Sequence, residues 1–282
     1  MSPSGPSIRV VLPTYNEADN LEPIVAAVLD VAPAGTGILV VDDASPDGTG
    51  EIADRLAAAD SRVEVMNRRA KEGLGPAYVA GFGRALVEGA ELIVQIDADF
   101  SHDPADVPTL IAAAADADLV LGSRYVPGGG VGEWGLARRV ISRGGSNYAR
   151  LWLGLDVRDL TGGFKCYRRE VLEAIRLESV GALGYAFQVE TTYRAALAGF
   201  RIAEVPIVFN DRRIGESKMS RAIVAEAALG VPLMRLRGRR WGCARGPAGA
   251  ESQLAPGVAR GPDDADQDAR HGSEDRNDQE IT

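Results

Sequence analysis

The sequence predicts a single α/β domain, built on a mainly parallel (mixed) sheet with helices on both faces. Short apolar runs alternate with segments of helical spacing through residues 8–121, and this alternation is typical of parallel sheets. Three of the apolar runs end in polar groups, and such sheets bind ligands at the carboxyl ends of their strands. The chain has 282 residues, of which 45% are hydrophobic, so it can bury one large core of this kind.

Each element of the first half follows from its apolar pattern. Short apolar runs predict strands over residues 8–12, 38–41, 63–66, 91–96 and 119–121. Helical spacing predicts helices over residues 18–31, 75–87 and 107–115, and a further helix that carries Ile52 and Leu56 on its apolar face.

The second half is less regular. We expect a glycine-rich loop over residues 125–135, an arginine-containing amphipathic helix over 136–153 and strands over 164–167 and 202–209. We further expect a helix over 186–197, a polar loop over 212–220 and a last helix over 222–229. The domain is placed at residues 7–235. We expect residues 236–245 to form a basic segment of the kind found beside membranes. A basic patch suited to anionic lipid would consist of Trp241 and the arginines at 235, 237, 239, 240 and 245. A solvated chain end paired with the acidic tail is the alternative.

The tail over residues 246–282 holds nine Asp or Glu against three Arg, and we expect it to be disordered. The formal net charge of −9 argues against a nucleic-acid partner. Cys166 and Cys243 lie far apart, which favours two reduced thiols in a cytoplasmic protein over a disulfide framework or zinc site. The longest apolar stretch, residues 222–234, is too short and interrupted to span a bilayer, so we expect only peripheral membrane contact or a membrane-anchoring partner subunit.

The segment after the fourth predicted strand carries the most information. Asp97 and Asp99 follow an apolar run and are separated only by Ala98. An unpaired buried carboxylate is costly, so this strand is expected to open into a polar cleft. Two close carboxylates suit Mg²⁺ or Mn²⁺, which typically also holds substrate phosphates. We therefore predict a nucleotide-phosphate site here.

The first two strands end in polar groups as well. Tyr15 could stack on a base or ribose and Glu17 could accept hydrogen bonds from them, whereas the alternative is a plain turn with Asn16 near a helix cap. Asp43 offers a carboxylate for ribose or base, although helix capping is the alternative and suits Asp47 better. The Gly-x-Gly-x-x-Gly pattern of NAD-binding domains is missing after the first strand.

Several cations and hydroxyls form a second group of candidates. Arg124 follows the fifth strand and suits a phosphate, or equally an ion pair with a neighbouring Asp. Arg138 and Ser142 lie one helical turn apart and could clamp an anionic acceptor, while the pair at 139 and 143 reads as a solvated basic face. Arg212 and Lys218 lie in a glycine-containing loop that could close over phosphates or be an ordinary surface loop. His102 could act as a base or a ligand, but a single histidine beside Asp103 and Pro104 is more often structural.

Together these motifs resemble glycosyltransferase family 2, with its GT-A fold, and within it the dolichol-phosphate (polyprenol-phosphate) mannose synthases. The resemblance covers roughly residues 7–230. Its motifs include residues 13–17, 41–49 and 97–99, and further segments at 122–125, 141–144, 159–164, 184–190 and 215–219.

The resemblance implies a role for each motif residue. Asp97 and Asp99 would hold Mg²⁺ or Mn²⁺, and Ser101 stands where some members have a glutamine ligand. The acceptor, a polyprenyl (dolichyl) phosphate lipid, would be gripped by Arg124, Arg138 and Ser142. Arg212 and Lys218 would close on the donor, and with Asp99 and Arg124 they form the predicted catalytic set. The guanosine part of the donor GDP-mannose would bind Pro13, Tyr15, Glu17, Val41 and Asp43. Ala98, between the two aspartates, belongs to the same donor site.

The expected reaction is metal-dependent and inverting, and it yields a β-linked polyprenyl phosphate mannose. The lipid phosphate is already anionic near neutral pH, so positioning and charge stabilisation are the enzyme's main tasks. Alternatives are a polyprenyl-phosphate glucosyltransferase that uses UDP-glucose, and a non-catalytic sugar-nucleotide-binding subunit. A nucleotidyltransferase is disfavoured, because no glycine-rich, lysine-containing phosphate loop follows the first strand.

Overall fold

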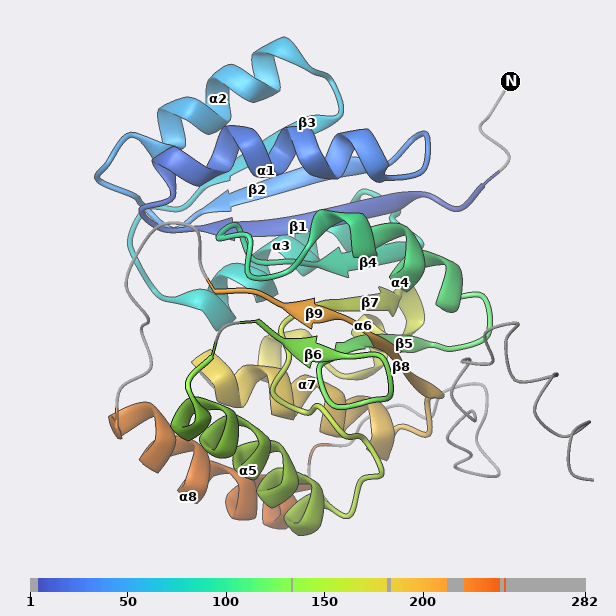
Figure 1. The fold of residues 1–282 in the computed structure, drawn as a ribbon. Helices are drawn as coiled ribbons and strands as arrows, with labels where there is room; N and C mark the ends of the chain where they lie inside the picture. Colours follow the sequence, from blue (N-terminus) through green and yellow to red (C-terminus); the bar gives the residue numbers. More distant parts are fainter. Residues whose placement is uncertain (1–4, 133, 182–183, 212–220, 239–240, 242–282) are drawn as a thin grey trace, which may run out of the picture.

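The computed structural model describes residues 5–132, 134–181, 184–211, 221–238 and 241. A seven-stranded sheet in the order β3-β2-β1-β4-β7-β5-β8 forms its centre, with helices on both faces (Figure 1). The strands are β1 (Ile8–Thr14), β2 (Gly37–Asp42), β3 (Val63–Asn67), β4 (Leu92–Gln95), β5 (Leu119–Ser123), β6 (Gly130–Val131), β7 (Lys165–Arg168), β8 (Ile202–Pro206) and β9 (Val208–Phe209). The predicted mixed sheet is confirmed, since β7 runs antiparallel to its neighbours β4 and β5 while the other pairs are parallel.

The helices agree closely with the sequence pattern. They are α1 (Ala18–Val31), α2 (Thr49–Ala59), α3 (Leu74–Val87), α4 (Val107–Ala113), α5 (Leu136–Leu153), α6 (Arg169–Ala174), α7 (Gly184–Leu197) and α8 (Arg221–Gly238), with short 3₁₀ turns at Pro104–Asp106 and Leu177–Ser179. The predicted limits of α1 and α5 are confirmed residue for residue. In Figure 1, α5 and α8 lie side by side outside α7.

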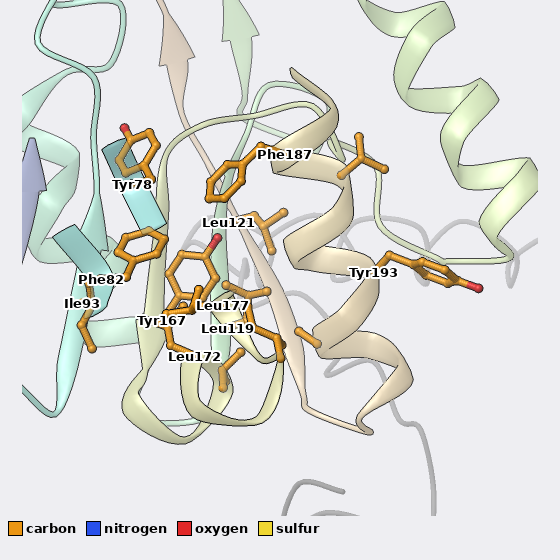
Figure 2. Close-up of a cluster of buried hydrophobic side chains, with 14 of the residues drawn as sticks. Tyr78, Phe82, Ile93, Leu119, Leu121, Tyr167, Leu172, Leu177, Phe187 and Tyr193 are labelled. Atoms are coloured by element: carbon orange, nitrogen blue, oxygen red, sulfur yellow. The ribbon is translucent and has the colours of Figure 1, made fainter. Parts of the chain in front are cut away.

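Alternate residues of the central strands supply two hydrophobic cores. Val10 and Leu12 of β1 face the core under α1, α2 and α4, while Val11 faces the core under α3, α6 and α7. Aromatic rings fill much of the second core (Figure 2). Tyr78 stacks on Phe82 at 5.5 Å between ring centroids. Phe82 in turn packs on Tyr167 of β7 at 5.4 Å between ring centroids, which holds α3 against the sheet. Tyr78 of this helix carries a hydroxyl that reaches the site described below.

The second half departs from prediction in several places. The strand expected over 202–209 divides at Ile207, because β9 turns away to pair with β6 in a separate two-stranded sheet. The loop expected over 125–135 therefore contains β6. The last helix extends from Arg221 to Gly238, through Pro232, instead of ending at residue 229. Trp241 packs on Tyr193 of α7 at 5.9 Å between ring centroids, so it covers the core and does not join an outward basic patch.

Some predictions fall on parts of the chain outside the described residues. These are the acidic tail over 246–282, Cys243, and the loop with Arg212 and Lys218. Cys166 is a free, buried thiol, and burial raises its pKa to about 12, so it stays protonated.

Strand register brings the polar strand ends together. Thr14 of β1 pairs with Asp42 of β2, and Val11 pairs with Gln95 of β4. The residues that follow these strands, from Tyr15, Asp43 and Asp97 onward, therefore emerge at one edge of the sheet. This edge is the place where the sequence predicted a ligand.

Candidate active site

The three polar strand ends share a backbone feature. Asn16 after β1, Ala44 after β2 and Phe100 after β4 adopt left-handed conformations, with φ values of 58°, 59° and 59°. Non-glycine residues rarely adopt this conformation, and strained residues of this type cluster at functional sites. This shared conformation marks the three strand ends together as candidate site segments.

Asp97 and Asp99 lie close to one phenol. The Tyr78 hydroxyl donates to Asp97 Oδ1 at 2.7 Å. Burial raises the pKa of Tyr78 well above its usual value, and the charges of Asp97 and Asp99 raise it further. Asp99 Oδ1 accepts a hydrogen bond from the backbone N–H of Ser101 at 3.0 Å. The predicted pair of carboxylates is thus held by a core tyrosine and by its own turn.

This pair fits a divalent cation that is shared with a substrate. Among the described residues, no cluster of three or more His, Cys, Asp or Glu side chains is placed to hold a metal ion. Mg²⁺ is usually bound through one or two carboxylates together with substrate phosphates, so two carboxylates suffice. Ser101 is buried beside Asp99, and its role as a ligand stays a prediction.

The end of β1 presents an aromatic surface. Tyr15 is half-buried, and the Lys71 ammonium lies 3.5 Å from the centroid of its ring. The Glu17 carboxylate accepts from Asn20 Nδ2 at 2.8 Å. Asp47 caps this region, as expected, by accepting from the backbone N–H of Thr49 at 3.1 Å and of Ala18 at 3.2 Å.

Asp43 anchors the loop that precedes α3. Its carboxylate pairs with Arg68 and accepts from the backbone N–H of Gly73 at 2.7 Å and of Glu72 at 3.1 Å. The neighbouring Asp42 binds the Thr14 hydroxyl and Ser45 within its own turn. A role for Asp43 toward a nucleoside stays a prediction. Three further residues predicted for the donor are buried at the same strand ends, namely Pro13, Val41 and Ala98.

Arg124 forms a buried ion pair with Asp159. Its Nε and Nη2 atoms donate to the two carboxylate oxygens, each at 2.7 Å, and Nη2 also reaches Thr161 Oγ1 at 2.8 Å. Burial raises the pKa of Asp159, but the charge and hydrogen bonds of Arg124 outweigh burial, so this pKa lies below its usual value. The ion-pair interpretation of Arg124 therefore describes this structure, and contact with a phosphate stays a prediction.

Arg138 and Ser142 of α5 lie near Arg124. Ser142 accepts from the Tyr125 hydroxyl at 2.7 Å, and the Arg124 guanidinium lies 5.2 Å from the Tyr125 ring. Arg138 pairs with Asp211 and stacks on Trp134 at 4.1 Å from the ring centroid. The three predicted acceptor residues thus come together around Tyr125 and Trp134.

Sequence reasoning missed several residues of this region. Tyr78 gives no local sequence signal. Asp159 and Gln188 lie in segments that carried the family resemblance, but no role was predicted for them, because each reaches the site from a distant element. His102 is buried between Phe164 and Phe209, as a structural histidine would be. Burial lowers its pKa to about 4, so it is neutral at physiological pH.

Carboxylates and a basic helix thus gather at the carboxyl edge of a mainly parallel sheet, which is where folds of this kind bind their ligands. Residues 9–176 match glycosyl transferase family 2. The chain belongs to this family and is a glycosyltransferase.

Two relatives cover most of the chain. It is 46% identical over 247 residues to an undecaprenyl-phosphate mannosyltransferase from Micrococcus luteus, covering 88% of this chain and 98% of the relative. It is 50% identical over 232 residues to a polyprenol monophosphomannose synthase from Mycolicibacterium smegmatis, covering 82% and 87%.

The solved structures support the fold. Glucosyl-3-phosphoglycerate synthase from Mycobacterium tuberculosis, in a complex with Mn²⁺, UDP-glucose and phosphoglyceric acid, superposes with a TM-score of 0.59 at 21% identity. The match covers 82% of this chain and 80% of that chain. A further crystal structure of the same enzyme gives a TM-score of 0.55. The expected GT-A-type fold is confirmed by these neighbours together with the family match.

Proposed function

We propose that this glycosyltransferase transfers mannose from GDP-mannose to a polyprenyl (dolichyl) monophosphate, with inversion at the anomeric carbon. The observation that carries the proposal is the match to the two mannosyl-transferring relatives over nearly their whole lengths. The structure adds a site with two halves, one of carboxylates after β1, β2 and β4 and one of arginines around α5. These halves suit a metal-bound sugar nucleotide and an anionic acceptor.

The carboxylate half is assigned to the donor. Asp97 and Asp99 would hold Mg²⁺ or Mn²⁺, which supplies charge neutralisation at the diphosphate. Tyr15 offers a ring on which a base can stack, and the half-buried Glu17 offers a hydrogen-bond acceptor. Arg212 and Lys218 are assigned, by resemblance, to the closing loop.

The arginine half is assigned to the acceptor. Arg124, Arg138 and Ser142 would orient the lipid phosphate, whose own oxygen is the nucleophile. Because that oxygen is anionic near neutral pH, no side chain needs to remove a proton from it. Positioning this oxygen in line with the anomeric carbon is then the main contribution of these residues.

The outer side of α5 supports contact with a membrane. Leu136, Val140 and Leu151 lie along one side of the helix and are 79%, 63% and 81% exposed, and Ile141 and Trp152 lie beside them. We call these five residues the α5 outer face. The helix contains four arginines and no acidic residue. Apolar groups flanked by arginines are suited to an anionic bilayer surface.

This placement agrees with the chemistry of a lipid acceptor. No helix in the described part of the chain has the length and apolar character that a bilayer span needs. A polyprenyl chain stays in the bilayer, so its phosphate must be met at the surface, near Arg138 and Ser142 of the same helix. Peripheral contact with the cytoplasmic side of a membrane, alone or through a partner subunit, is therefore part of the proposal.

A donor competition tests the function. The protein is incubated with vesicles that contain polyprenyl phosphate, with Mg²⁺ or Mn²⁺, and with labelled GDP-mannose or UDP-glucose. We expect label from GDP-mannose to enter the lipid phase as a β-linked product. Label from UDP-glucose alone would replace the proposal with a glucosyltransferase, and no lipid-linked label from either donor would indicate a non-catalytic subunit.

A further inference from the structure

Gln188 of α7 lies beside Asp97, although no role has been given to it so far. It is buried, and it faces Gly163 in the loop before β7. A Cβ atom added to Gly163 would lie 3.3 Å from Gln188 Nε2 and 3.5 Å from Asp97 Oδ2. The missing side chain of Gly163 thus leaves a small space where an amide nitrogen and a carboxylate oxygen converge.

A buried network fixes the orientation of the Gln188 amide. Gln95 Nε2 donates to Gln188 Oε1 at 2.8 Å, and the Tyr167 hydroxyl donates to Gln95 Oε1 at 3.2 Å. The reverse orientation would direct the Gln188 carbonyl oxygen toward the Asp97 carboxylate, where two acceptors repel each other. The amide nitrogen therefore faces the space beside Asp97 and Gly163.

The helix that carries Gln188 is also tied firmly to the sheet. The Lys165 ammonium donates to the backbone oxygen of Gln188 at 2.7 Å and to Thr192 Oγ1 at 3.0 Å. All of these groups are buried. A side chain held this way is preorganised, so a ligand that meets it loses little entropy in ordering it.

The amide nitrogen itself has no hydrogen-bond acceptor among the described residues. This nitrogen is not among the fully buried side-chain atoms that lack a partner, so it keeps some contact with solvent, where water or a ligand can accept its hydrogen bond. A hydroxyl group is the ligand that matches both neighbours, because it can accept from Gln188 Nε2 and donate to Asp97 Oδ2. A phosphate oxygen matches only the amide, since it would be repelled by the carboxylate.

We propose that Gln188 is a sugar-binding residue, whose amide donates to a hydroxyl of the hexose that is transferred, beside Asp97 and opposite Gly163. This inference rests on the proposed function, since it assumes a sugar nucleotide whose diphosphate lies at Asp97 and Asp99. It assigns part of the sugar selectivity to α7 and to the loop before β7.

Two substitutions act on this contact in different ways. Gln188→Glu keeps the oxygen that accepts from Gln95 and removes only the amide donor. Gly163→Ala fills the space with a methyl group, which would lie 3.3 Å from Gln188 Nε2 in tight contact, and it keeps the amide donor itself. We expect each variant to raise the KM for GDP-mannose or lower kcat/KM, by about 100-fold for Gln188→Glu and about 10-fold for Gly163→Ala.

Binding of GDP, which lacks the sugar, distinguishes a sugar contact from a general defect. Both variants should bind GDP with a Kd within about two-fold of wild type, because one lost sugar hydrogen bond leaves the nucleotide contacts intact. Equal losses of GDP and GDP-mannose binding, or wild-type kinetics in both variants, would overturn the inference.

The wild-type reaction separates this inference from the proposed function. If wild type transfers no mannose from GDP-mannose, the proposed function fails, and the same comparison is made with UDP and UDP-glucose. If wild type transfers mannose while both variants match it, the sugar assignment alone fails. Val87→Ala, at a position of α3 that is 87% exposed and outside this network, is the control and should keep the wild-type KM.

Discussion

The Arg124–Asp159 pair gives the sharpest test of how the site is held together. Both side chains are almost fully buried, with 6% and 0% of their surface exposed. Two side-chain hydrogen bonds of 2.7 Å and one backbone hydrogen bond of 3.0 Å join them. Removal of one partner from such a pair leaves an uncompensated charge, so Asp159→Ala should lower the free energy of unfolding by about 3–5 kcal/mol.

Replacement of both partners should cost less than removal of one. In Arg124→Met with Asp159→Leu, no buried charge is left, and apolar groups fill much of the volume. Urea unfolding of wild type, both single variants and the double variant closes a double-mutant cycle. We expect a coupling energy of about 2 kcal/mol or more between the two positions. A cost below about 1 kcal/mol for Asp159→Ala would refute this account of the pair.

The same pair predicts a pH dependence with a defined sign. Arg124 holds the pKa of Asp159 below its usual value despite burial. A carboxyl with a depressed pKa adds stability above its unfolded pKa of about 3.9, and this stability is lost as the pH falls through the lower folded value. Unfolding measured from pH 7 to pH 2 should therefore show a steeper acid loss for wild type than for Asp159→Asn. Parallel curves would contradict the prediction.

Three further predictions concern other parts of the molecule. Asp99→Ala should abolish the formation of lipid-linked mannose, while circular dichroism and the melting temperature show an intact fold. Near-normal turnover of this variant with metal present would contradict the proposed metal role. Burial lowers the pKa of Lys165 to about 7, whereas the pKa of a lysine in the unfolded chain is about 10.4. Between these two pH values the unfolded chain binds one more proton than the folded protein, so stability rises with pH. Wild type should gain up to about 4–5 kcal/mol of stability across that range relative to Lys165→Met, as measured by urea unfolding. Leu136→Glu with Val140→Glu should abolish sedimentation with anionic vesicles, whereas Val87→Glu, at a position 87% exposed on α3, should not.

The parts of the fold that depend on local pattern could be read from the sequence. The helices α1 and α5 show helical spacing throughout, and the strands β1, β2 and β4 are short apolar runs. The polar residues that end these strands were predicted to meet at one edge of the sheet, and they do, because the carboxyl ends of parallel strands lie together. Asp97 and Asp99 were found in this way.

The remaining features depend on contacts that no local pattern records. The six residues of α6 are too few to show a helical period. The left-handed turn at Phe100 involves a residue type that seldom adopts this conformation. Gln95 and Gln188 are separated by 92 intervening residues, and only the folded sheet brings them together. The residues missed were therefore those whose role depends on a partner from another element.

The direction of β7 explains why the two halves of the site meet. β4 and β5 end at the carboxyl edge, but β7 lies between them and runs the other way, so it begins there. The loop that leads into β7 must therefore cross the edge between Asp97 after β4 and Arg124 after β5. This loop supplies Gly163 beside Asp97 and Asp159 beside Arg124. An antiparallel strand at this position is thus the feature that links the carboxylate half to the arginine half, and a parallel strand would have carried the same loop to the opposite edge.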